Sequence, residues 1–372
     1  MYQRNGPLKG IRVVEMAGLG PAPFSCMHLA DLGAEVVRVA RPGQTFPFPI
    51  DDKFNIYDRS RRTLELDLRT IEDQNSLWQL LDRAEILIEG FRPGVMEKLG
   101  FGPDEVLGRN PALVYGRMTG WGQAGPLAQA AGHDLNYAAL TGAIWSVGKA
   151  DTPPPVPLNV IADLAGGAMM LSVGVLAALT HARATGEGQV VDAAMTDGAA
   201  LMMAMQYGFL SAGLWNDTER GSNFMNDGVA WYGCYETADG GYVTLGSLEP
   251  QFFGEFLEKV GLSNNPAFAD QYAPSAQAEM KARLAELFAS KTRDVWCSLL
   301  EGTDACFAPV LSMVEAPDHP HNKARETFVD IDGVTQPAPT PRFSRSPADM
   351  PLAAGGPAMN IAEILEHWGG NP

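Results

Sequence analysis

Residues 11–39 have the sequence IRVVEMAGLGPAPFSCMHLADLGAEVVRV. Residues 11–16 are rich in β-branched side chains and predict a strand, and residues 18–23 predict a tight turn. Residues 24–32 predict a helix that ends at Gly33, and residues 35–39 predict a second strand. The segment is therefore a βαβ unit, whose two strands run parallel.

The alternation of strands and helices continues to about residue 118. Further strands are expected at 64–68, 85–89 and 113–118, and helices at 71–81 and 95–99. This order predicts a large, Rossmann-like, doubly wound α/β domain around a parallel sheet. We expect its ligand site at the carboxyl ends of the strands.

The glycine turn after the first strand does not fit a dinucleotide-binding fingerprint. Gly18 and Gly20 occupy the first two glycine positions, but Pro23 stands at the third. The second strand leads to Arg38 and Arg41, where NAD binding requires a carboxylate. The sequence thus predicts the topology of a nucleotide-binding fold without its nicotinamide site.

The rest of the chain predicts a second, smaller α+β domain. A proline-rich connector at 151–159 is followed by two long helical stretches with a short strand, 189–194, between them. A polar linker follows Trp215. The expected division is 1–215 for the large domain, with 320–372 returning to it, and 216–319 for the linker and small domain. The small domain should contain a hairpin at 231–236 and 242–246, and helices at 252–260, 277–290 and 293–300; a last helix should cover 361–368.

Charge excludes several classes of partner. The 372 residues include 27 Lys and Arg against 44 Asp and Glu, a net charge of −17, which disfavours binding to nucleic acid or to an anionic membrane. Residues 1–125 hold 15 of the 27 basic and 16 of the 44 acidic side chains, so the first third is nearly neutral. That asymmetry suggests a small anionic ligand there, and a chance distribution is the alternative.

The compartment expected from the sequence is the cytoplasm. The four cysteines form no metal or redox motif and suit reduced thiols, and no secretory or peroxisomal signal is recognised. Two uncharged runs, 164–182 and 198–216, approach the length of a membrane span but are rich in Gly, Ala and Ser. We expect them to be helices buried in protein.

Three motifs place a titratable side chain at the start of a helix. His133 follows a glycine-rich loop and can titrate near neutral pH, and a structural histidine is the alternative. Asp163 precedes a long apolar run, where it is either an N-terminal cap or a carboxylate with a raised pKa that works as an acid or base. Glu249 precedes a third helix, and a helix-start carboxylate is again the alternative.

Basic side chains cluster near several strand ends in the first third. The group can bind an anion at the sheet edge, or it can be a solvated charged face with the aspartates interspersed along it. Its members are Arg38, Arg41, Arg59, Arg61, Arg62, Arg69, Arg92 and Lys98.

Together these segments resemble the family III CoA-transferase superfamily and, within it, the alpha-methylacyl-CoA racemases. The superfamily resemblance rests on residues 8–15, 31–37, 92–95, 117–125 and 188–194. The narrower resemblance rests on residues 132–137 (GHDLNY), on Ala162-Asp163 with the glycines after it, and on residues 249–252 (EPQF).

The resemblance implies an interlocked homodimer whose active site lies between the large domain of one subunit and the small domain of the other. The substrate would be an acyl-CoA, and neither a metal nor an organic cofactor would be needed. It implies a racemase that interconverts (2R)- and (2S)-2-methylacyl-CoA through an enolate. His133 and Asp163 would be the acid-base pair, Glu249 would orient His133, and the Asp134 backbone N–H would bind the thioester oxygen. The binding residues it implies are Arg41, Leu66, Asp67, Leu68, Arg69, Gly90, Phe91, Arg92, Lys98, Gly132, Asn136 and Tyr137. Lys98 departs from the arginine expected there, which puts bidentate phosphate contact in doubt.

Two alternatives remain. A CoA-transferase on the same fold would use Asp163 as a nucleophile that forms an acyl anhydride, and it has no evident use for His133 with Glu249. A noncatalytic acyl-CoA-binding protein would keep the arginines but would not need His133 and Asp163 together.

Overall fold

The computed structural model describes residues 4–44 and 49–369. The chain divides into two units. The first contains Met1–Ala143, Pro157–Ala204 and Ala324–Pro372, and the second contains Ile144–Val156 and Met205–Lys323. Residues 144–156 and 205–215, which the sequence placed in the large domain, therefore group with the second unit.

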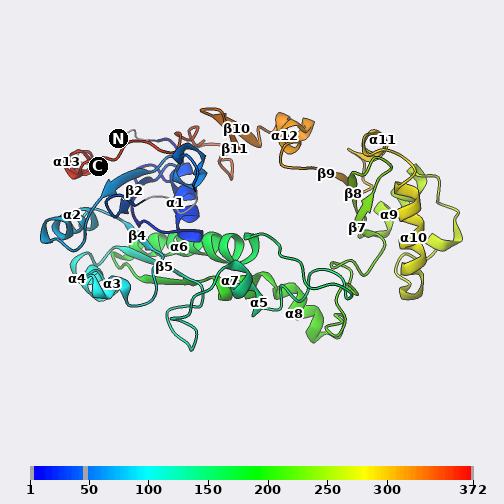
Figure 1. Ribbon diagram of the computed structural model, residues 1–372, viewed down its shortest axis with the longest axis horizontal. Helices are drawn as coiled ribbons and strands as arrows, with labels where there is room; N and C mark the ends of the chain where they lie inside the picture. Colours follow the sequence, from blue (N-terminus) through cyan, green and yellow to red (C-terminus); the bar gives the residue numbers. More distant parts are fainter. Residues whose placement is uncertain (1–3, 45–48, 370–372) are drawn as a thin grey trace. The chain divides into compact units, whose positions relative to one another are not determined.

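A six-stranded parallel sheet organises the first unit (Figure 1), as predicted. Its order, β3-β2-β1-β4-β5-β6, reverses direction between β1 and β4, which is the switch point of a doubly wound sheet. The strands are β1 (Arg12–Met16), β2 (Glu35–Ala40), β3 (Arg62–Glu65), β4 (Ile86–Glu89), β5 (Val114–Thr119) and β6 (Val190–Ala194).

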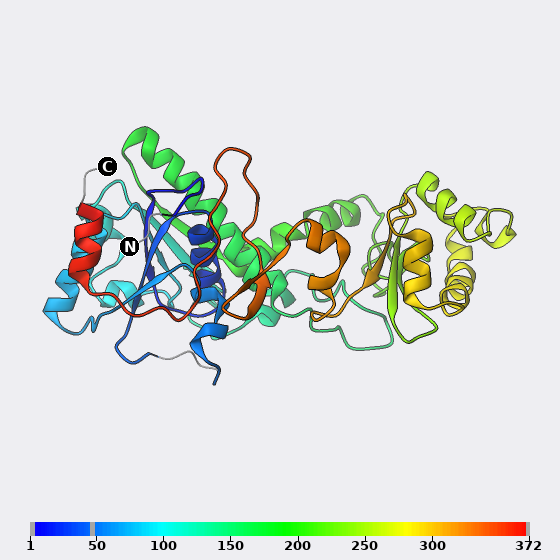
Figure 2. The same ribbon diagram turned by 90° about the horizontal axis from the view of Figure 1, so that it is seen from above.

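Helices cover both faces of this sheet. Four lie against the face that presents Val14, Leu87 and Tyr115: α2 (Ile71–Leu81), α3 (Val95–Lys98), α4 (Pro103–Arg109) and α13 (Ile361–Gly369). On the other face are α1 (Pro21–Asp31) and α6 (Met170–Thr185), joined by a 2.8 Å hydrogen bond between the Ser25 and Ser172 hydroxyls. The C-terminal helix α13 packs beside α2, far from it in sequence (Figures 1 and 2).

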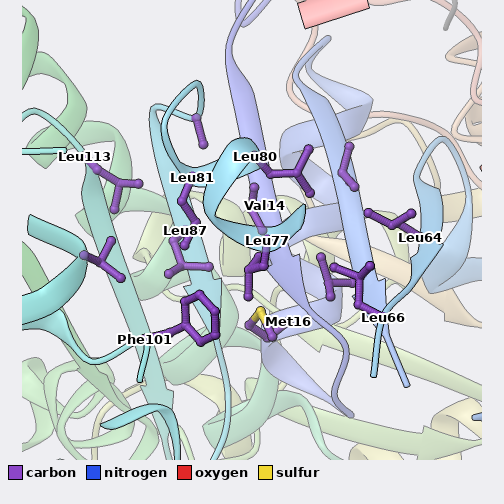
Figure 3. Close-up of a cluster of buried hydrophobic side chains, with 14 of the residues drawn as sticks. Val14, Met16, Leu64, Leu66, Leu77, Leu80, Leu81, Leu87, Phe101 and Leu113 are labelled. Atoms are coloured by element: carbon purple, nitrogen blue, oxygen red, sulfur yellow. The ribbon is translucent and has the colours of Figure 1, made fainter. Parts of the chain in front are cut away.

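The core between the sheet and α2 is almost entirely aliphatic. Figure 3 shows Val14 and Leu87 on the neighbouring strands β1 and β4, with Leu77 of α2 close to them. Helix α2 begins where the sequence predicted, because the Thr70 side chain accepts a hydrogen bond from the Asp73 N–H at 3.2 Å. At one end of this core Met16 and Leu66 reach the carboxyl edge of the sheet, where the ligand site is expected.

The third strand lies earlier than predicted. The sequence placed it at 64–68, but β3 ends at Glu65. The Asp67 N–H donates to the Asp73 carboxylate at 2.7 Å instead of to a strand neighbour, so the chain leaves the sheet there. Leu66 and Leu68 alternate like strand residues because both still pack on the core.

One apolar helix is long enough to cross a membrane by length and composition: Val160–Thr185. It comprises η3 (Val160–Met169), which has π-helical hydrogen bonding, and α6. It packs against α1, β5, β6 and α7 (Met195–Met202). The burial expected for this run is only partial, because Val173 of α6 is 58% exposed, and the second uncharged run, 198–216, contains a helix, α8 (Ala204–Ser211), with no buried residue. Gly166 and Gly198 touch where η3 crosses α7, because a Cβ on either would overlap the backbone of the other.

The second unit has its own sheet and core. Strands β7 (Tyr232–Glu236), β8 (Tyr242–Gly246) and β9 (Phe307–Val310) pair antiparallel, and α9 (Pro250–Lys259), α10 (Gln277–Phe288) and α11 (Arg293–Leu300) supply much of the apolar core. The predicted hairpin and helices are present to within a few residues. The remaining elements are α5 (Asp134–Ala139), α8 (Ala204–Ser211), α12 (Pro320–Ala324), β10 (Phe328–Ile331) and β11 (Val334–Pro337), with short helical turns η1 (Asp52–Phe54), η2 (Ile56–Asp58), η4 (Pro266–Phe268), η5 (Pro274–Ala276) and η6 (Ala316–Asp318).

Candidate active site

Two hollows lie at the carboxyl ends of the parallel strands in the first unit. One, the His133 cleft, has a volume of about 550 Å³ and is lined by residues that follow β1, β4 and β5, including Gly20, Gly90, His133 and Asp163. The other, the Arg41 groove, has a volume of about 570 Å³ and is lined by residues that follow β1, β2 and β3. Phe91 lines both, so the two hollows meet beside the switch point of the sheet.

His133 precedes helix α5 and is exposed to the cleft. Its backbone N–H donates to the Asn136 side chain at 3.1 Å, which fixes the entry to the helix. Tyr137 donates its hydroxyl to the Gly132 carbonyl, and its ring lies so close to Gly120 and Gly132 that a Cβ on either would collide with it. The two glycines thus allow Tyr137 to pack behind His133.

Asp163 reaches the same cleft from η3. It is the fourth residue of that helix, and its carboxylate accepts a hydrogen bond from the Asn159 side chain at 3.4 Å. The interpretation of Asp163 as an N-terminal cap is therefore wrong. Burial raises the pKa of Asp163, and the nearby Asp134 charge raises it further, while Asn159 and His133 oppose that shift. The direction suits a carboxyl group that both accepts and returns a proton.

The carboxylate of Asp134, rather than that of Asp163, caps η3. Asp134 is 4% exposed, and its Oδ2 accepts the backbone N–H of Ala162 at 2.7 Å and of Asp163 at 2.8 Å. The backbone N–H of Asp134 itself is the first of helix α5, and within residues 4–44 and 49–369 no acceptor bonds it. This N–H is thus available to a ligand atom.

Sequence reasoning missed two other cleft residues, Tyr57 and Asn159. Burial raises the pKa of the Tyr57 and Tyr137 hydroxyls, and the negative charge of Asp163 raises both further, so both rings are close to that carboxylate. Asn159 lies four residues before Asp163, a spacing that signals contact on one helical face. No local signal in the sequence indicates Tyr57, which η2 supplies from between β2 and β3.

The Arg41 groove holds the predicted segment 66–69 and Arg41. Arg69 is bound in a two-bond pair with Asp67, at 2.8 and 2.7 Å, and this pair lowers the pKa of Asp67 to about 2. Arg41 is exposed, and among the described residues its guanidinium makes no ion pair. Arg41 is therefore the cation that the groove offers most directly to an anion.

The turn between the two hollows is held by buried charges. The Phe91 N–H donates to the Glu89 carboxylate at 2.7 Å, and Arg117 joins Glu89 to Glu97 at 2.8 Å each. This network fixes Gly90, Phe91 and Arg92, which all line the cleft. Lys98 is exposed at the end of α3, beside Leu99, but does not itself line either hollow.

Two of the clustered arginines are neither a solvated face nor anion ligands. Arg59 is 3% exposed and binds Asp31 at 2.5 Å, and Arg61 is 6% exposed and binds Glu15 and Asp58. Both join secondary-structure elements inside the first unit. Part of the charge balance of the first third therefore comes from buried ion pairs, which sequence reasoning could not separate from surface charge.

Glu249 belongs to the second unit, where it precedes α9. Its carbonyl accepts the N–H groups of Phe252 and Phe253 at 3.1 Å each, but its side chain makes no capping hydrogen bond. The carboxylate is exposed, and among residues 4–44 and 49–369 it has no ion pair. Within the described residues, no group of three or more His, Cys, Asp or Glu side chains is arranged to hold a metal ion.

Known proteins similar to this chain agree on one family. The family model for CoA-transferase family III matches residues 8–361. The alpha-methylacyl-CoA racemases of Mus musculus and Homo sapiens are 41% and 40% identical to it, over 97% of this chain and 93% of each relative. A solved CAIB/BAIF family protein from Brucella suis superposes with a TM-score of 0.82 at 26% identity and covers 98% of this chain and 100% of its own.

Proposed function

The chain belongs to CoA-transferase family III, and we propose that it is a racemase that interconverts (2R)- and (2S)-2-methylacyl-CoA thioesters by 1,1-proton transfer through an enolate. One observation carries the proposal: His133 and Asp163 line the same cleft but come from different segments, His133 from the start of α5 and Asp163 from η3. Inversion at C2 requires two acid-base groups on opposite faces of a planar intermediate.

In the proposed reaction His133 and Asp163 exchange roles with direction. One removes the C2 proton while the other protonates the opposite face, and each is left ready for the reverse reaction. The Asp134 backbone N–H would stabilise the charge that develops on the thioester oxygen. The thioester itself acidifies C2, so the proposed mechanism uses neither a metal nor an organic cofactor.

The Arg41 groove supports the CoA half of the proposal. Phosphates bound near Arg41 would leave the pantetheine arm to pass Phe91, where the groove meets the cleft, so that the thioester lies between His133 and Asp163. Binding energy from these remote groups would then hold C2 in place for proton transfer.

We further propose that the active unit is a homodimer in which Glu249 of one protomer orients His133 of the other. Large apolar side chains exposed on the first unit, among them Leu140, Val173 and Leu201 at 62%, 58% and 57%, are what a second copy would cover. The proposed compartment is the cytoplasm.

Deuterium incorporation tests the reaction. The pure protein is incubated with one epimer of a 2-methylacyl-CoA in deuterated water without any free carboxylic acid. We expect deuterium at C2 and the appearance of both epimers. Turnover only after a carboxylic acid is added would favour the transferase that uses Asp163 as nucleophile. No turnover in either condition would favour a binding protein.

Variants of the two bases test their roles. His133→Ala and Asp163→Ala should each reduce racemisation by at least a hundredfold, because general acid-base catalysis contributes about 10²–10⁴. Affinity for CoA should change little, since neither side chain lines the Arg41 groove. Racemisation at the wild-type rate by either variant would refute the role assigned to that residue.

A further inference from the structure

The side chain of Asp134 links the two proposed bases. The residue follows His133 directly and begins α5, while its buried carboxylate extends to the start of η3. There one oxygen, Oδ2, accepts the backbone N–H of Ala162 and of Asp163, at 2.7 and 2.8 Å. Asp134 is thus covalently attached to one base and hydrogen-bonded to the backbone of the other.

The two N–H groups that donate to Asp134 have no acceptor within helix η3 itself. N–H groups in the first turn of a helix lack partners inside that helix. A carboxylate satisfies two of them with charge-assisted bonds, which are shorter and about twice as strong as neutral ones. Within η3 the backbone of Asp163 is therefore fixed at its own N–H.

Capping η3 uses only one oxygen of the Asp134 carboxylate, Oδ2. Its second oxygen, Oδ1, is buried and has no hydrogen-bond partner among the described residues. Leaving a charged oxygen unpaired in the interior opposes stability, and a neutral Ser or Asn cap would avoid that. A buried charge at this position is better explained by a requirement of the site than by stability of the helix.

We propose that the Asp134 carboxylate is a positioning residue that fixes the location of Asp163 relative to His133, so that both can reach C2 of one substrate. The inference rests on the proposed racemase reaction and adds a role for a side chain whose backbone N–H alone is used in that reaction. Loss of the carboxylate should move Asp163 but leave His133 in place, because the His133 N–H keeps its bond to Asn136.

Such a one-sided displacement has a distinct kinetic signature. Racemisation needs both bases, so it must slow equally in both directions, as the equilibrium between the epimers demands. Proton exchange without inversion needs only one base: the substrate is deprotonated and reprotonated on the same face. It should survive for the epimer that His133 deprotonates and be lost for the other.

The experiment compares Asp134→Ala and Asp134→Leu with the wild type. Both keep the backbone N–H and remove the oxygen that accepts the Asp163 N–H, and Leu, which is closer to Asp in shape, offers a second route if the Ala variant does not fold. Each pure epimer is incubated in deuterated water, and deuterium in retained and inverted product is followed by mass spectrometry after separation of the epimers. Asp239→Ala is the matched control, because the Asp239 carboxylate likewise accepts a helix-start N–H, from Arg293 at 3.1 Å, but in the second unit.

We expect racemisation by either Asp134 variant to fall at least tenfold, exchange with retention to persist for one epimer within threefold of wild type, and the control to be unaffected. An equal fall of exchange for both epimers, as a loss of folded protein would cause, overturns the inference. So does unchanged racemisation. A wild-type protein that exchanges neither epimer would instead refute the proposed function, and the inference with it.

Discussion

The Arg41 groove yields a quantitative prediction, because its two cations differ in their partners. Arg41 is exposed and makes no ion pair within the described part of the chain, whereas Arg69 is already bound to Asp67 through two bonds. A CoA phosphate should therefore gain more from Arg41 than from Arg69. Replacing Arg41 with Ala removes the contact without altering any ion pair that holds the fold.

The expected loss of CoA affinity in Arg41→Ala follows from the exposure of the Arg41 side chain. Two unit charges 4 Å apart attract by about 1 kcal/mol in water and about 4 kcal/mol at the effective dielectric constant of a protein surface. Because Arg41 is exposed, the lower part of that range applies. A loss of about 1–1.4 kcal/mol weakens CoA binding roughly five- to tenfold.

The opposite substitution should strengthen binding. Asp67→Asn removes the carboxylate that holds Arg69 and also removes a negative charge from the groove, so the affinity for CoA should rise. Titration calorimetry with CoA measures both changes, and Arg345→Ala is the control, since this exposed arginine lines neither hollow. Raising the salt concentration should reduce all of the differences.

The reasoning fails if Arg41→Ala binds CoA within twofold of the wild type, or if Asp67→Asn binds it more weakly. The first result would place the phosphates outside the groove. The second would show that Asp67 orients Arg69 for the ligand instead of withholding it. Lys98→Ala should have a smaller effect than Arg41→Ala, because Lys98 does not line the groove.

Three further predictions concern the proton-transfer site, the fold and the interface. Asn159→Ala should move the acid limb of kcat/KM to higher pH for the epimer that Asp163 deprotonates: the lost hydrogen bond lowered the pKa of that carboxyl group, so protonation now removes the base at a higher pH. A limb that stays in place or moves down contradicts this, and Leu158→Ala is the neighbouring control. Arg59→Met should lower the free energy of unfolding by about 3–5 kcal/mol, because it leaves Asp31 buried without its partner. Denaturant titration measures this, and a loss below 1 kcal/mol would show that the pair is dispensable. Val173→Asp should shift the protein from dimer toward monomer in sedimentation velocity, since it puts a charge on the exposed apolar surface; an unchanged sedimentation coefficient would exclude that surface from the interface.

The sequence predicted correctly the elements whose ends and buried faces are set by residues close together in the chain. Helix α2 was predicted to the residue, because Thr70 caps it and its apolar spacing is regular. The bounds predicted for the third strand were wrong. Leu66 and Leu68 alternate like strand residues, but β3 ends at Glu65. Alternation shows which side chains are buried, but it does not show where the backbone hydrogen bonds of a strand stop, as they do where the Asp67 N–H donates to Asp73.

The same distinction applies to the candidate site. The proposed bases, His133 and Asp163, stand in recognisable motifs, and the structure brings them to one cleft. Tyr57 and the capping role of the Asp134 carboxylate depend on contacts between segments far apart in the chain. Buried pairs such as Arg59 with Asp31 carry the same residue types as a binding surface, so composition alone could not separate them.

The start of helix α1 differs from the helix start of a dinucleotide-binding fold, although the sheet topology is of the same kind. In dinucleotide-binding folds the free N–H groups at this helix start hold a pyrophosphate. Here Pro21 and Pro23 remove two of those N–H groups, and Phe24 donates its own to Gly20. The helix start is thus a poor anion site, although the sheet order is the same.

Asp163 occupies the space that this change leaves. Its Oδ2 lies only 3.6 Å from where a Cβ on Gly20 would stand, and Gly20 has the positive φ of 71° that glycine adopts without strain. A phosphate here would meet the carboxylate of Asp163, so under the proposed function the anionic part of the ligand binds elsewhere. The Arg41 groove, on the other side of the switch point, is the place proposed for it, and the helix start is left for a carboxyl group whose raised pKa suits the proposed proton transfer.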